Sequence, residues 1–188
     1  KNFVAYYYNE KCRDNTVIVW EEDGEIISML HLNPYKISVC RRIFDTYYVV
    51  AVATDKDHRH KGYMTRLLKA SFELMKKESI PFCFLLPVDK AIYEWIGFFE
   101  ICSFTRERKG GEVSSRKSIS ELNENYEIFC VRDELYLKRL EMEDKLAAEG
   151  EEEALPENPV IMAKITDHDK MSEAVPDNVS RDKYEEWL

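Results

Sequence analysis

The feature that most constrains the fold is the passage from an apolar run at residues 47–53 to an amphipathic stretch at residues 63–78. An unbroken run such as YYVVAVA is typical of a central strand covered on both faces. In the second stretch, small or apolar residues recur with helical spacing while charged residues occupy the other faces. These inward positions are Met64, Leu67, Leu68, Ser71 and Met75. The sequence therefore predicts a strand followed directly by a helix.

Other patterns place further strands around this unit. An Asp-Gly pair at residues 23–24 separates two β-rich runs, 16–20 and 26–32, and predicts an antiparallel hairpin. The Asn33-Pro34 pair predicts a break after the second run. The remaining expected elements are strands over 35–40, 43–53, 80–88 and 98–104 and a helix over 90–96 that ends at Gly97. This order predicts an α/β fold, of the α+β type, with a mixed sheet covered by helices.

Charge and cysteine usage exclude several classes of function. The net charge is −9, and residues 141–159 alone hold eight acidic residues against one lysine. The rest of the chain is close to neutral, so we expect no nucleic acid partner and no membrane partner, since both require a broad basic surface. The five cysteines are scattered and form no C-x-x-C pair, which favours reduced thiols and a cytoplasmic location.

A basic turn connects the central strand to the helix. Residues 58–61 read HRHK and are followed by Gly62, the only glycine between Gly24 and Gly97. A helix N-terminus offers free N–H groups and a positive dipole end, and a glycine there lets backbone approach a phosphate closely. This spacing excludes the Walker and dinucleotide glycine motifs, which need further glycines. The H-x-H pair lacks partners at ligand spacing, so no metal site is predicted.

An Arg-x-x-Gly turn after an apolar strand and before an amphipathic helix resembles the GCN5-related N-acetyltransferase (GNAT) superfamily. The resemblance covers about residues 3–104 and includes YYVVAVAT, RHKGYM, FCFLLP and IYEWIGF. The last of these, together with NPVIMAKI near the C-terminus, looks more particularly like the Eis-type branch. The resemblance implies a GNAT acyl-CoA N-acyltransferase fold with a partial C-terminal extension, and acetyl-CoA as cosubstrate.

The resemblance also assigns the cofactor-binding residues. The backbone of Val52, Ala53 and Thr54 would bind the pantetheine and the acetyl carbonyl, where the central strand splays from its neighbour. The pyrophosphate would lie in the turn, mostly on main-chain N–H groups of Arg59, His60, Lys61, Gly62, Tyr63, Met64 and Thr65. Met64 stands where the superfamily motif often has a second glycine or alanine.

Tyr93 is the catalytic residue that the resemblance implies. It aligns with the tyrosine that Eis-type enzymes use as general acid, and a phenol can donate the proton that a departing CoA thiolate needs. Eis-type enzymes take their base from the terminal carboxylate, which does not map onto Leu188, so no base is assigned. The expected reaction is direct acetyl transfer to a primary amine, on a small molecule or a peptide, in a ternary complex. Eis-type relatives also suggest a homo-oligomer.

The domain organisation follows from the same resemblance. Residues 1–105 are expected to form the acetyltransferase domain, and 106–157 a linker and acidic helical segment left from a second GNAT-like domain. Residues 158–188 would form part of a sterol-carrier-like domain. A non-catalytic CoA-binding sensor or interaction module is the alternative function, and a structural or lipid-carrier role for the C-terminal segment is a third.

Overall fold

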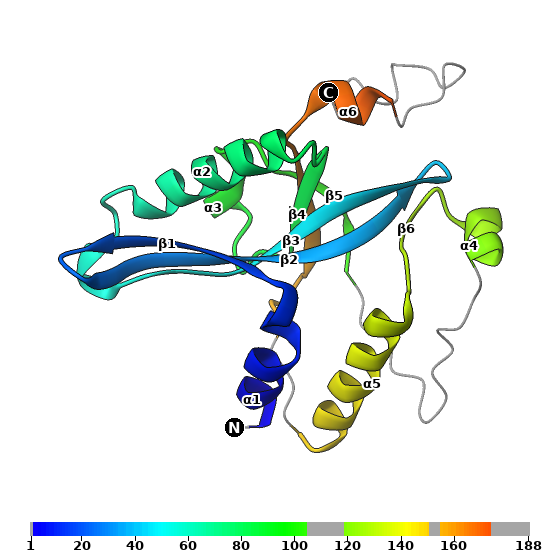
Figure 1. The fold of residues 1–188 in the computed structure, drawn as a ribbon, viewed down its shortest axis with the longest axis horizontal. Coiled ribbons are helices and arrows are strands. Elements are labelled where there is room, and N and C mark those ends of the chain that lie inside the picture. The colour runs from blue at the N-terminus through cyan, green and yellow to red at the C-terminus, as the bar shows by residue number, and fades with distance from the viewer. Residues whose placement is uncertain (1, 105–118, 151–154, 174–188) are drawn as a thin grey trace.

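The computed structural model of the chain describes residues 2–104, 119–150 and 155–173 (Figure 1). Its helices are α1 (Asn2–Asn9), α2 (Tyr63–Lys77), α3 (Ala91–Glu94), α4 (Ile119–Asn125), α5 (Glu134–Ala148) and α6 (His168–Ser172), with 3₁₀ turns η1 (Lys11–Asp14) and η2 (Lys56–His58). Its strands are β1 (Thr16–Glu22), β2 (Glu25–Val39), β3 (Arg42–Thr54), β4 (Phe82–Leu85), β5 (Phe99–Ser103), β6 (Ile128–Cys130) and β7 (Val160–Ile165). The polar stretch 105–118, expected as a linker or exposed loop, lies outside the described residues.

The strands form one mixed sheet, which confirms the predicted fold class. Their order is β1-β2-β3-β4-β7-β5, with β6 beside β2. Only β3 and β4 pair in parallel among these described strands, and the other pairs are antiparallel. Strand β7 comes from the segment expected at 158–188, and it lies between β4 and β5. The division into domains stays a prediction. Strand β7, from the expected segment 158–188, belongs to the same sheet as the strands of the expected domain 1–105.

Strand β2 is longer than the sequence predicts. The hairpin at Asp23-Gly24 is confirmed, because both residues have the positive φ that a two-residue turn needs. The predicted break at Asn33-Pro34 is wrong, since β2 continues to Val39 and Pro34 pairs with Tyr47 of β3. On the outer side of β2, β1 reaches Leu32 and β6 begins pairing at Ile37. Pro34 falls in the interval between them, where the N–H that it lacks is not needed.

Helix α2 covers one face of the sheet, with α1 and α5 on the opposite face (Figure 1). Four of the five predicted inward positions are confirmed, because Leu67, Leu68, Ser71 and Met75 are buried, and Met64 is partly buried. Leu67, Leu68 and Met75 pack in a core that includes Leu30 and Leu32 of β2 and Val49 of β3. Full burial of each large side chain contributes about 1.5–3 kcal/mol, so this face fixes the start of α2 relative to β3.

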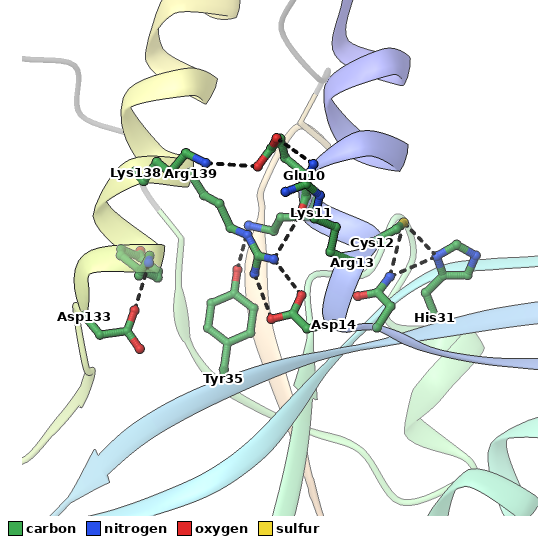
Figure 2. Close-up of polar contacts among 12 residues, drawn as sticks. Glu10, Lys11, Cys12, Arg13, Asp14, His31, Tyr35, Asp133, Lys138 and Arg139 are labelled. Carbon is green, nitrogen blue, oxygen red and sulfur yellow. Dashed lines mark hydrogen bonds and ion pairs between the residues drawn. The ribbon is translucent and has the colours of Figure 1, made fainter.

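A network of charges attaches α5 to the N-terminal segment (Figure 2). Arg139 of α5 is only 8% exposed and donates two hydrogen bonds to Asp14, at 2.6 and 3.2 Å. A third bond of 2.9 Å reaches the carbonyl oxygen of Glu10. Tyr6 of α1 donates to Glu143 of α5 at 2.7 Å. These contacts join segments more than 120 residues apart, which the sequence pattern did not indicate.

The network yields a prediction for stability. Replacing Arg139 by alanine leaves Asp14 and the Glu10 carbonyl without their donor, and we expect a loss of about 2–3 kcal/mol in the free energy of unfolding. Lys138→Ala is the matched control, because its ion pair with Glu10 is exposed and is worth at most about 0.5 kcal/mol. Urea denaturation measures both. Equal effects of the two substitutions would contradict the account.

Candidate active site

The candidate site begins where β3 and β4 diverge. Their parallel pairing covers Tyr47 with Cys83 and Tyr48 with Phe84. Strand β3 continues to Thr54, paired with β2 on its other side, whereas β4 ends at Leu85. Figure 1 shows the two strands separating in this direction. No described strand therefore pairs with the β4 side of the last residues of β3, where Val52, Ala53 and Thr54 lie.

A bulge in β3 marks the beginning of this open edge. His31 of β2 lies opposite Val50, and Met29 lies opposite Ala53, so two residues of β3 face one of β2. Ala51, within the bulge, has φ +52°, a conformation that residues with a side chain adopt at a cost. A bulge bends its strand and redirects the backbone groups beyond it. It therefore sets the direction of the three residues that the resemblance assigns to the pantetheine.

The basic turn folds into η2 and a short loop. Asp55 caps η2 by accepting hydrogen bonds from the Asp57 N–H and from the His58 ring, at 3.0 and 2.9 Å. His60 and Gly62 both have positive φ, +61° and +83°, and together they reverse the chain into α2. Arg59, His60 and Lys61 are exposed beside the helix, so Arg59 and Lys61 place two positive charges there. The Arg59 Nε also donates to the Thr54 carbonyl oxygen at 3.3 Å.

The start of α2 offers unused hydrogen-bond donors. Gly62 is the N-cap and supplies no side-chain cap, and the first helical hydrogen bond is donated by Arg66 to the Gly62 carbonyl. The N–H groups of the first turn consequently have no partner within the helix. No acidic residue lies in that turn. The free donors, the dipole and the neighbouring cations together make this end of α2 favourable for an anion.

Tyr63 is held by the β1–β2 hairpin. Its hydroxyl donates to both carboxylate oxygens of Glu22, at 3.0 and 3.1 Å, and the Trp20 indole donates to the same carboxylate at 2.9 Å. These hydrogen bonds lower the pKa of Glu22. The Arg66 guanidinium lies over the Trp20 ring, 5.3 Å from its centre. The hairpin thus holds the Tyr63 side chain. The Tyr63 backbone N–H lies in the first turn of α2, where it has no partner within the helix. No sequence pattern indicated this role for Glu22.

Tyr93 lies on α3. It is half-buried against the same core cluster as Val52, and its ring meets Phe98 edge-on at 5.7 Å. Burial raises the pKa of its phenol, so the group keeps its proton throughout the neutral range. No described side chain is seen to hydrogen-bond its hydroxyl. The arrangement gives a protonated phenol at the border of the core, with its donor available.

The comparisons with known proteins decide the family. The family model described as an acetyltransferase (GNAT) domain matches residues 2–102, which is more than half of the chain. The chain belongs to this GNAT acetyltransferase family. The resemblance seen in the turn and strands is therefore confirmed at the level of the family. A comparison with curated proteins finds no match.

Solved structures give weaker likenesses to this GNAT chain. A probable N-acyltransferase from Enterococcus faecalis aligns with 51% of the chain, at 14% sequence identity and a TM-score of 0.49. A GCN5-related N-acetyltransferase from Kribbella flavida aligns with 47% of the chain, at 16% sequence identity and a TM-score of 0.43. The chain spans only 25% and 24% of these two proteins. The ribosomal-protein-S18-alanine N-acetyltransferase of Escherichia coli aligns with 95% of the chain and 79% of its own, at 12% identity and TM-score 0.48. The assignment rests on the family match.

Within the three described stretches of this GNAT chain, no helix combines the length and the apolar character needed to cross a bilayer.

The bulge yields a prediction that needs no ligand. A β-branched residue tolerates positive φ poorly, so Ala51→Val should lower the free energy of unfolding by about 1–2 kcal/mol. Ala53→Val is the matched control, since it makes the same change two residues further along β3, without positive φ and at an exposed position, and should change stability by less than about 0.5 kcal/mol. Urea denaturation distinguishes them. A neutral Ala51→Val would mean that the bulge is not present in solution.

Proposed function

We propose that the protein is an acetyl-CoA-dependent N-acetyltransferase that transfers the acetyl group directly to a primary amine in a ternary complex. The observation that carries the proposal is the open edge of β3, followed by a short turn that leads into the N-terminus of α2. An extended ligand arm can hydrogen-bond along the edge while its phosphates lie at the helix N-terminus. Acetyl-CoA combines such an arm, the pantetheine, with a pyrophosphate, and membership of the GNAT family supports this choice.

Backbone groups would carry most of the cofactor affinity. The pantetheine would lie along Val52, Ala53 and Thr54, and the pyrophosphate on the N–H groups of Gly62 to Thr65. Arg59, His60 and Lys61 are exposed beside this position and would add charge attraction. Changes to those side chains should therefore weaken binding less than a change at Gly62.

Tyr93 would act as the general acid. When the amine attacks the thioester carbonyl carbon, the C–S bond breaks and its electron pair moves to sulfur, which then takes the phenol proton. A buried phenol with a raised pKa is protonated at neutral pH and suits this task. The position of this tyrosine within AIYEWIGF also supports placing the protein in the Eis-like branch. We propose with it that the protein self-associates and that it acts in the cytoplasm. Leu188, considered for the base, lies outside the described residues.

Gly62 allows a matched test of cofactor binding. Gly62→Ala forces a side chain into φ +83° and should reduce acetyl-CoA affinity at least about tenfold in calorimetry. Gly150→Ala places the same strain at φ +81° after α5, with equally open space around the new atom, and should leave affinity unchanged. If wild-type protein does not bind acetyl-CoA, or if both variants bind equally, the proposed cofactor site is wrong.

The acid is tested by turnover. Tyr93→Phe should keep acetyl-CoA affinity and lower the rate of thiol release by about 10²-fold or more, measured with alkylamines, polyamines, aminoglycosides and a lysine-containing peptide. Tyr47→Phe is the control, because Tyr47 packs against the same core but bonds Glu78 through its hydroxyl. Normal turnover by Tyr93→Phe would remove the acid assignment. Binding without any thiol release by the wild-type protein would favour the sensor alternative.

A further inference from the structure

A second cluster of polar side chains lies on the opposite face of the sheet from α2. His31 of β2 is 3% exposed and stacks on Tyr7 of α1, with ring centres 5.8 Å apart. Its Nδ1 atom lies 3.0 Å from the Tyr7 hydroxyl, 3.3 Å from the Asn15 amide nitrogen and 3.8 Å from the Cys12 sulfur. Figure 2 shows Cys12 of η1 and His31 of β2 turned toward each other. The proposed mechanism uses none of these groups.

The position of His31 connects this cluster to the reaction. His31 pairs directly with Val50, the residue before the bulge at Ala51. Directly opposite residues in an antiparallel pair have Cα atoms about 4.5–5.5 Å apart and project to the same face. The cluster therefore lies beside the point where the open edge of β3 begins. An amine held at this cluster would therefore lie on the α1 face, on the side of β3 that is paired with β2.

The protonation states of the cluster suit His31 to act as a proton acceptor. Burial lowers the pKa of His31, so the ring is neutral at neutral pH. Its Nδ1 atom faces two donor groups, the Tyr7 hydroxyl and the Asn15 amide nitrogen, so we assign the ring proton to Nε2 and the acceptor role to Nδ1. Burial raises the pKa of both Tyr7 and Cys12, which keeps these groups protonated. The strand partners of His31 are Val17 and Val50, which carry no charge. On η1 and α5, Asp14 is paired with Arg139 and Lys11 with Glu143, and Arg13 is paired with Glu10.

Two buried acceptors in the cluster lack donors. The side-chain oxygens of Asn33 and Asn15 are buried and have no hydrogen-bond partner among the described residues. Asn33 is 3% exposed and neighbours His31 on the same face of β2, two residues along. A buried acceptor without a donor costs about 1–3 kcal/mol. A neutral primary amine can supply an N–H donor to one of these oxygens and keep its second N–H for a proton acceptor, whereas a carboxylate or phosphate has no N–H to donate.

We infer that Tyr7, His31 and Asn33 form the acceptor end of the active site and recognise a primary amine, an inference that rests on the proposed function. The Asn33 oxygen accepts one N–H of the amine, and the other N–H points to the Tyr7 oxygen. As the amine nitrogen bonds to the acetyl carbon, its proton passes to the Tyr7 oxygen while the Tyr7 proton passes to His31 Nδ1. The step ends with an amide, a cationic His31 and a CoA thiol protonated by Tyr93. Solvent then returns the proton from His31 to Tyr93.

The test compares Tyr7→Phe and His31→Gln with Tyr6→Phe. Tyr6 is the matched control, because it precedes Tyr7 on α1 but its hydroxyl bonds Glu143 of α5. With the amine that gives the fastest thiol release, we expect kcat/KM to fall about 10²-fold or more in the first two variants and less than threefold in Tyr6→Phe. Acetyl-CoA affinity by calorimetry should stay within twofold in all three.

The pH profile separates a proton acceptor from a structural residue. A base must be unprotonated, so wild-type kcat/KM should fall as the pH drops through the lowered pKa of His31, below about 6.5. This fall in kcat/KM should be absent in His31→Gln. The separate fall caused by protonation of the amine substrate should remain in both the wild-type protein and His31→Gln. Unchanged rates, or a persistent His31 limb, would overturn the inference and leave the proposed function standing. A wild-type protein without thiol release would overturn both. If His31→Gln fails to fold, Tyr7→Phe decides, since it removes one hydroxyl.

Discussion

The antiparallel pairing of β2 with β3 is the interaction on which the rest of the structure depends. It runs from Ser28 opposite Thr54 to Val39 opposite Arg42 and supports β3 along almost its full length. Because β2 supplies this support, β3 can continue past the point where β4 leaves it. The open edge and the bulge at Ala51 lie in the part of β3 that, among the described strands, pairs with β2 alone. Without that pairing, no neighbouring strand would hold the backbone of the candidate site in place.

The two faces of this strand pair serve different parts of the proposed reaction. On one face, the apolar core under α2 fixes the helix N-terminus at the end of β3, where phosphates would bind. On the other face, α1 and η1 cover His31 and Asn33, where the amine would bind. Helix α5 lies beyond the residues that match the family model, yet Arg139 holds η1 in place through Asp14. A segment outside the family match thus supports the acceptor side.

Local patterns predicted what local forces determine. The spacing of Leu67, Leu68, Ser71 and Met75 predicted the inward face of α2, and the Asp-Gly pair predicted the hairpin, because both depend on neighbouring residues. Pro34 misled the prediction, since its effect depends on which strands lie beside β2 at that position. The bulge at Ala51 has no glycine to indicate it. The pairing of β7 with β4 and the approach of Tyr7 to His31 join residues distant in sequence, where periodicity carries no information.

Hydrogen–deuterium exchange of backbone amides, with and without acetyl-CoA, tests the central claim most directly. The account places the cofactor on backbone groups of two segments, the end of β3 at Val52–Thr54 and the start of α2 at Gly62–Thr65. It predicts that acetyl-CoA slows exchange in both segments and leaves the solvent-exposed hairpin at Asp23-Gly24 unchanged. Binding that protects neither segment, or that protects only the face covered by α1 and α5, would contradict the account.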